Sequence, residues 1–288
     1  MSNILNNVKI YFSFLGASLK EMLIYRLDCL VGIVSQVVTQ AVEIIFVFIA
    51  FRNTENLAGW NFKQVLLLYG ITLISVGIKT LCVDGLYDFG PKYGVYMKRK
   101  LKKLLKTKER VNEVLKLRKN GEFDKILLRP VHPLISILGA TKEFVALGYL
   151  VLGFAMTIIM LIKLSIPITF ILIVRILFFS IIGAAIIGAI NTICSISSFW
   201  TYRSNEVIWS FDRIYTFAQY PIDIYSSFIK ILITYILPFA FVAYYPSLAY
   251  LGMDKYMIYL SPVVAMVLWI VAVKIWNLAL NKYRSTGN

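Results

Sequence analysis

Two apolar runs set the structural class of this chain: residues 144–162, FVALGYLVLGFAMTIIMLI, and residues 168–190, ITFILIVRILFFSIIGAAIIGAI. Each run is close to the roughly 20 residues that an α-helix needs to cross the hydrocarbon core of a bilayer. The connection between them, residues 163–167, is KLSIP, which is long enough only for a tight hairpin. The pattern therefore predicts two neighbouring transmembrane helices.

The composition of the whole chain agrees with this interpretation. Of its 288 residues, 59% are hydrophobic and 16% are charged, whereas a soluble domain carries about 25% charged residues. The surplus of apolar surface must face lipid. We predict an all-α, multi-pass membrane protein whose residues 1–288 form a single transmembrane domain.

Further apolar runs extend the pattern in both directions from the opening pair. The fifth of them is interrupted by Pro238, and Tyr244–Gly252 after it is too short and broken to cross, which is typical of a re-entrant extracellular segment. Residues 5–26 mix apolar and basic positions, as in a helix that lies along the membrane surface. The six predicted spans are residues 27–51, 65–86, 144–162, 168–190, 227–245 and 259–280.

Positive charge is distributed unevenly about these spans. The two termini and the second and fourth loops hold 22 lysines and arginines, and the other three loops hold 4. Because basic residues collect in cytoplasmic loops, both termini and the long loop at residues 87–143 are expected in the cytoplasm, with the chain in the cell membrane. The net charge of +15 is explained in the same way, so a nucleic-acid partner is not predicted.

The most basic stretch, residues 98–119, has leucines and valines at helical spacing among its lysines. A lysine-rich run can contact nucleic acid, but this one lies close to a membrane span. We therefore predict that it contacts anionic lipid head groups.

Motifs for catalysis are absent from the sequence. It has no GxxxxGK[ST] phosphate loop, no HExxH, no GxSxG and no paired carboxylates at useful spacing. Three scattered cysteines and the single histidine, His132, do not make a metal site. No catalytic residue and no metal site are predicted.

Four ionisable residues fall inside predicted spans: Glu43, Lys79, Asp84 and Arg175. Charges in hydrocarbon are unfavourable, so they face a bundle interior or water. They either line a translocation route or pair to position helices, and pairing is the interpretation we favour. Residues 183–189 carry small side chains four apart, which lets another helix approach closely, in this chain or in a second subunit.

A short helix is predicted in the polar loop at residues 121–130, GEFDKILLRP. Glu122 and Asp124 lie in its first turn, where a helix favours negative charge, and Pro130 ends it. Phe123, Ile126 and Leu127 share one face, which needs an apolar groove. That groove belongs either to a partner protein or to the chain's own bundle.

Three stretches in order carry a family resemblance: GEFDKILLRP at 121–130, LPFAFVAYYP at 237–246, and Trp276 followed by YRSTG at 283–287. With this layout of spans, the chain resembles the membrane subunit of ABC-2 type exporters, in the branch of six-span permeases without an ATPase domain. The basic run 98–119 is extra length relative to that pattern.

The resemblance implies a second permease, identical or related, and two cytoplasmic ATP-binding cassette subunits. ATP and Mg²⁺ would be bound by those subunits, and no cofactor is expected in this chain. It also implies that residues 121–130 form a coupling helix seated in a groove of the ATPase. By motif match, its contact residues would be Glu122, Phe123, Asp124, Leu127, Leu128 and Arg129.

On this basis the sequence predicts half of an ATP-driven export pathway, and its apolar spans suit an amphiphilic substrate such as a peptide, drug or lipid. Two alternatives remain open. One is an ion-coupled secondary transporter with Glu43, Asp84 and Arg175 as a relay. The other is a membrane scaffold or immunity-type protein that transports nothing.

Overall fold

The computed structural model describes residues 9–17, 20, 24–52, 54, 56–87, 89, 122–139, 145–199, 204–254 and 256–282. The lysine-rich run at 98–119, Gly121 and the tail motif at 283–287 lie outside these residues. The predicted lipid contact of the run therefore stays a prediction.

The described part of the chain is helical apart from one very short hairpin, which confirms the predicted all-α membrane class. Five helices in it are long and apolar enough to cross a bilayer. They are α2 (Arg26–Phe51), α3 (Phe62–Val83), α9 (Val145–Lys163), α10 (Phe170–Ser195) and α14 (Ser261–Asn281). The strands of the hairpin are β1 (Asn56–Leu57) and β2 (Trp60–Asn61).

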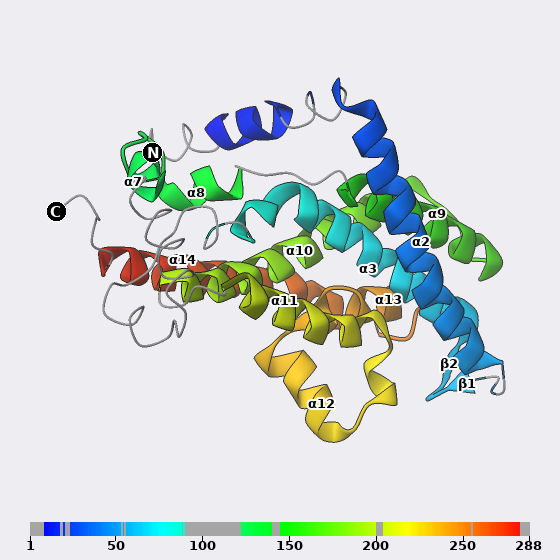
Figure 1. Ribbon diagram of the computed structural model, residues 1–288. Helices are drawn as coiled ribbons and strands as arrows, with labels where there is room; N and C mark the ends of the chain where they lie inside the picture. The colour runs from blue at the N-terminus through cyan, green and yellow to red at the C-terminus, as the bar shows by residue number, and fades with distance from the viewer. Residues whose placement is uncertain are drawn as a thin grey trace, which may run out of the picture.

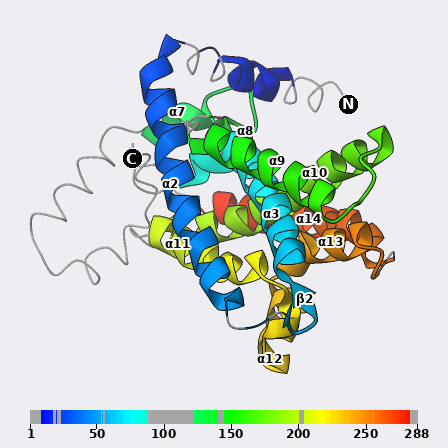
Figure 2. The ribbon, with the colours of Figure 1, turned by 90° about the vertical axis from the view of Figure 1, so that its right-hand side faces the viewer.

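Helix α3 is the centre of the bundle (Figures 1 and 2). In its most apolar window 78% of the residues are buried, against 17% in α2, which lies at the periphery. Helices α9 and α10 pack on α3, α14 packs on α10, and α2 packs mainly along α9. The chain thus surrounds α3 with later helices and leaves one long face of α2 uncovered.

The contact between α3 and α9 depends on two glycines. A Cβ atom on Gly153 would lie 2.8 Å from the backbone nitrogen of Ile74, and one on Gly70 would lie 2.7 Å from Oγ1 of Thr157. Real Cβ atoms do not approach so closely, so these glycines set the helix separation. The predicted small-residue stripe serves a similar contact within the chain, because Gly183 faces Ser75 and Val242.

The bundle has two ends that can be told apart by their contacts. At the first, the Trp276 end, the rings of Phe89, Phe123, Phe199 and Trp276 pack with centroids 5.0 to 6.2 Å apart. Residues 9–17 form a helix near this end (Figure 1), where the hydroxyl of Tyr11 donates to the carbonyl of Cys82 at 2.9 Å.

At the other end, the Asp223 end, one carboxylate gathers three elements. Trp60 Nε1 donates to Asp223 Oδ2 at 3.0 Å, the Tyr244 hydroxyl donates to the same oxygen at 2.6 Å, and Lys230 Nζ lies 3.6 Å from Oδ1. Trp60 is buried at this end of the bundle.

Helix α11 (Ser204–Tyr215) runs between these two ends. It follows Phe199 of the Trp276 end, continues as η3 (Thr216–Gln219) and η4 (Ile222–Ile224), and so reaches Asp223. It packs alongside α10 (Figure 1). The chain therefore passes from one end of the bundle to the other through residues that the sequence analysis placed in a cytoplasmic loop.

The predicted fifth span, residues 227–245, is not one straight helix in the structure. Helix α12 (Ser227–Ile231) continues as the π-helical turn η5 (Leu232–Ile236), the chain breaks at Pro238, and the next helical piece is bent from it by 73°. That piece comprises η6 (Phe239–Phe241) and α13 (Tyr244–Tyr250), and Tyr244 returns to Asp223. The segment leaves and re-enters at one end, because proline removes the hydrogen bond that a straight helix needs.

With α11 in place of that segment, the described part of the chain passes between the two ends six times. The re-entrant region is larger than the predicted Tyr244–Gly252, because it begins at Ser227. It leads through η7 (Met257–Leu260) into α14, which ends near the Trp276 cluster.

The revised fifth crossing predicts where single cysteines can be labelled. In a chain whose native cysteines are replaced by alanine, we expect Ser226→Cys and Tyr256→Cys to react with a membrane-impermeant maleimide from the same side of a vesicle. We expect Lys282→Cys to react from the opposite side. Labelling of Ser226→Cys from the side of Lys282→Cys would restore residues 227–245 as the fifth span.

The glycine contact predicts a sensitivity of the bundle to added volume. We expect Gly153→Leu to lower the stability of the folded chain by about 1–3 kcal/mol or more, because α9 must move away from α3. The measurement is the midpoint of thermal unfolding in detergent. Gly16→Leu is the matched control, since a Cβ there meets nothing within 4 Å. Equal midpoints for the two variants would contradict the contact.

Candidate functional site

The predicted coupling segment forms a short helix, α7 (Glu122–Leu127), followed by α8 (Pro133–Leu138). The Phe123 and Ile126 side chains are buried in the chain's own bundle, with the Phe123 ring 5.5 Å from that of Phe89. Leu128, just after the helix, is 85% exposed. The apolar groove required by the sequence pattern is therefore supplied by the chain itself, and only the opposite side of α7 is accessible.

Helix α8 links this segment to the central helix. It packs against η1 (Asp84–Leu86), the single turn that ends α3. His132, at the start of α8, lies 3.1 Å from the side chain of Asn277 in α14. Packed contacts therefore lead from α7 through α8 to the ends of α3 and α14.

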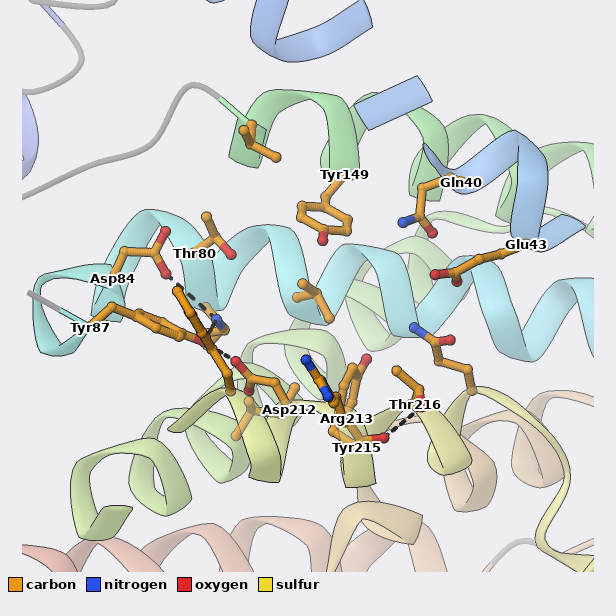
Figure 3. Close-up of a pocket in the computed structure, with 16 residues that line it drawn as sticks. Gln40, Glu43, Thr80, Asp84, Tyr87, Tyr149, Asp212, Arg213, Tyr215 and Thr216 are labelled. Carbon is orange, nitrogen blue, oxygen red and sulfur yellow. Dashed lines mark hydrogen bonds and ion pairs between the residues drawn. The ribbon is translucent and has the colours of Figure 1, made fainter. Parts of the chain in front are cut away.

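A cavity of about 650 Å³ opens between α2, α3, α9 and α11 (Figure 3). Its walls combine charged, amide and aromatic side chains, which is unusual inside a membrane bundle. The residues that line it are Gln40, Glu43, Val76, Lys79, Thr80, Asp84, Tyr87, Val145, Tyr149, Ile187, Trp209, Asp212, Arg213, Tyr215, Thr216 and Gln219.

Three of the four predicted intramembrane charges meet at this cavity: Glu43, Lys79 and Asp84. Arg175 is not among the lining residues. Its guanidinium lies 5.8 Å from the ring centroid of Tyr250, where it ties α10 to α13. The three members of the predicted ion relay are therefore not assembled at one site.

Lys79 is the centre of a buried network in the cavity wall. Its Nζ lies 3.5 Å from Asp84 Oδ1 and donates to the hydroxyl of Tyr87 at 3.0 Å. That hydroxyl donates to Asp212, and Asn191 Nδ2 donates to the same hydroxyl at 3.2 Å. These contacts join α3, η1, α10 and α11, so one lysine fixes the arrangement of three crossing helices and the turn that follows α3.

Tyr87 lies just beyond the α3 span, and burial raises its pKa above the ordinary value. The hydroxyl therefore keeps its proton at neutral pH and can donate to the carboxylate of Asp212 while accepting from Lys79.

A second polar group lies on the α2 side of the cavity. The Tyr69 hydroxyl is 2.7 Å from Glu43 Oε2 and also contacts the side-chain amide of Gln40. The Tyr69 hydroxyl has one proton, which it donates to the carboxylate of Glu43. The side-chain amide of Gln40 is then oriented so that its N–H₂ group donates to the oxygen of the same hydroxyl. Tyr69 thus orients Glu43 at the cavity edge.

Sequence reasoning missed Asp212 and Arg213 as site residues. Both lie on α11, where Glu206, Asp212 and Arg213 lower the local hydropathy below the level expected of a span. The signal that was available is amphipathicity: α11 combines these charges with the buried side chains of Ile208 and Tyr215.

A bundle of apolar helices around a charged cavity is typical of membrane transport proteins. The family model for ABC-2 family transporter proteins matches residues 37–93 and 94–287. The chain therefore belongs to the ABC-2 transporter family, whose members are membrane permeases that lack an ATPase site and associate with ATP-binding cassette subunits. No match was found among curated proteins or among solved structures.

The buried network predicts an asymmetric response to substitution. Lys79→Met removes the buried cation that pairs with Asp84 and reaches Asp212 through Tyr87, and we expect a loss of stability of about 3–5 kcal/mol. Adding Asp84→Asn should recover part of it, because one uncompensated charge is removed. Both are measured as midpoints of thermal unfolding.

The matched control is Lys230→Met, which breaks the half-exposed pair with Asp223. That pair is worth at most about 1 kcal/mol. A smaller effect for Lys79→Met than for this control would show that the network does not hold the helices together.

Proposed function

We propose that the chain is the permease subunit of an ATP-driven ABC exporter and encloses half of its translocation pathway. The observation that carries the proposal is the position of Arg213, which is exposed in the last turn of α11, near the middle of the stretch from Ser204 to Ile224 that runs between the two ends of the bundle. An arginine facing hydrocarbon at that depth is strongly unfavourable. The α11 face must therefore meet water or another protein.

A second permease, identical or related, satisfies this requirement. Helices α2 and α11 both border the cavity (Figure 3). Val38, Val42 and Phe46 of α2 are among its exposed apolar side chains. A partner that covers both helices would enclose the cavity and bury this apolar surface.

The orientation follows from charge. Lysines and arginines are concentrated in the loop before α7 and at the termini, so we place the Trp276 end in the cytoplasm and the Asp223 end outside. The labelling experiment on Ser226 and Lys282 determines this orientation when it is done on intact cells. ATP and Mg²⁺ bind to the cytoplasmic ATPase subunits. Residues 98–119 contact anionic lipid head groups.

Coupling to the ATPase takes place through α7. Phe123 was predicted as a contact residue, but its burial suits it to anchor the helix in the bundle. The accessible residues Leu128 and Arg129, with the acidic first turn of α7, are proposed to enter the groove of the ATPase. The remaining predicted contact residues are Glu122, Asp124 and Leu127.

A contiguous path leads from α7 to the cavity. Phe123 packs on Phe89, which lies two residues beyond Tyr87, and Tyr87 binds both Lys79 and Asp212. Closure of the ATPase would move α7 and so shift α3 relative to α11. Transport then requires that the substrate bind the two arrangements with different affinity.

The two alternatives have less support. The ion-relay hypothesis required Arg175 beside Glu43 and Asp84, and Arg175 lies on Tyr250 instead. A scaffold or immunity-type role gives no reason for a charged cavity between α2 and α11.

The coupling role predicts a loss of function without a loss of folding. We expect the double variant Leu128→Asp, Arg129→Glu to reduce ATP-dependent transport at least about tenfold, because two carboxylates would have to be desolvated in the ATPase groove. Co-purification of the ATPase subunit with the permease should fall in parallel.

Arg52→Glu is the matched control, because it makes the same charge reversal at the exposed end of α2. It should leave co-purification and transport unchanged. Normal co-purification and transport in the α7 variant would exclude α7 as the coupling helix.

A further inference from the structure

We infer that the cavity between α2 and α11 binds a zwitterionic amphiphile, with the cationic group of the ligand at Glu43 and its anionic group at Arg213. This inference rests on the proposed permease function and names the substrate class of its pathway. It follows from which charges in the cavity are already paired and which are not.

The cavity walls hold five charged residues. Lys79 is paired with Asp84, and Asp212 accepts hydrogen bonds from Tyr87 and Asn191 within the same network. These three groups are therefore occupied in holding α3, α10 and α11 together. Glu43 and Arg213 remain, one negative and one positive.

Glu43 is presented to the cavity as an acceptor. Its carboxylate is half-buried and oriented by the hydroxyl of Tyr69 at 2.7 Å. Among the described residues, no lysine or arginine lies within salt-bridge distance of it. A partly buried carboxylate without a cation favours a ligand that supplies one.

Arg213 is presented from the opposite wall. Figure 3 shows its guanidinium reaching upward from α11 toward the space below Tyr149, while Glu43 enters from α2. In the part of the chain that the structure describes, no carboxylate is within salt-bridge distance of Arg213. A guanidinium offers several N–H donors in a fixed plane, which suits a phosphate or carboxylate group.

A ligand with both charges satisfies both walls at once. A ligand with only one charge would leave either Glu43 or Arg213 desolvated and unpaired, which is unfavourable in a site of low polarity. A volume of about 650 Å³ is within the range of small-molecule sites, and the rings of Tyr149 and Trp209 provide surface for a quaternary or primary ammonium.

The apolar part of the ligand has a place on α2. Val42, next to Glu43, is 64% exposed, and Phe46, one turn on, is 65% exposed. An acyl chain attached to a head group at Glu43 can lie along this surface, between α2 and the second permease, without crossing the charged cavity. The ligand class is therefore a zwitterionic amphiphile and not a small polar zwitterion.

The test compares three probes with the same dodecyl chain: dodecylphosphocholine, dodecyl phosphate and dodecyltrimethylammonium. The full-length chain is placed in nanodiscs of phosphatidylglycerol, and equilibrium binding of each labelled probe is measured with binding to empty nanodiscs subtracted. We expect dodecylphosphocholine to bind at least about tenfold more tightly than either singly charged probe, since each charge-assisted contact is worth about 1.4 kcal/mol or more.

Two charge-neutral variants assign the ends of the ligand. Glu43→Gln should remove the preference over dodecyl phosphate, and Arg213→Gln should remove the preference over dodecyltrimethylammonium. The matched controls Asp28→Asn and Arg52→Gln neutralise exposed charges of α2 outside the cavity lining and should bind all three probes as the unmodified chain does.

Equal binding of the three probes by the unmodified chain would overturn the inference, and this comparison does not depend on the folding of any variant. Unchanged preferences in both Gln variants would overturn the placement at Glu43 and Arg213. Either result together with normal co-purification of the ATPase subunit would leave the permease function standing. Probe binding as expected without an ATPase partner would instead refute the permease function alone.

Discussion

A charged side chain inside a bilayer must find its partner within the protein or in water, and this constraint organises the structure. Lys79 on the central helix meets it through Asp84 and the hydroxyl of Tyr87, which in turn binds Asp212. Helix α11, polar enough to escape detection as a span, is held against α3 by these contacts. Among the described residues, Glu43 and Arg213 border the cavity without a salt bridge of their own.

The same contacts connect α7, the helix proposed to bind the ATPase, to the cavity. The aromatic cluster at the Trp276 end joins α7 to Phe89, and Phe89 follows closely on Tyr87. Closely packed rings transmit a displacement with little loss, because protein interiors are close-packed and nearly incompressible. The coupling that we propose would therefore act on the permease from one end, as suits a family whose members lack an ATPase site.

Individual residues show where sequence reasoning succeeded and where it failed. The apolar runs at 27–51, 65–86, 144–162 and 168–190 each fall on a described long helix, since length and hydropathy are local properties. Residues 227–245 passed the same test, but composition does not reveal that the chain bends at Pro238 and returns to Asp223. Three of the four predicted intramembrane charges line the cavity, but their pairing could not be predicted.

By itself the sequence determined the membrane class and most of the spans, since these depend only on how many apolar residues follow one another. It also pointed to the family, through short motifs at defined places. Only the tertiary structure decided that Phe123 is buried in its own bundle, that α11 is a crossing helix, and that Glu43 and Arg213 border one cavity. Those facts depend on contacts between residues far apart in the chain, and local patterns carry no information about which distant side chains will meet.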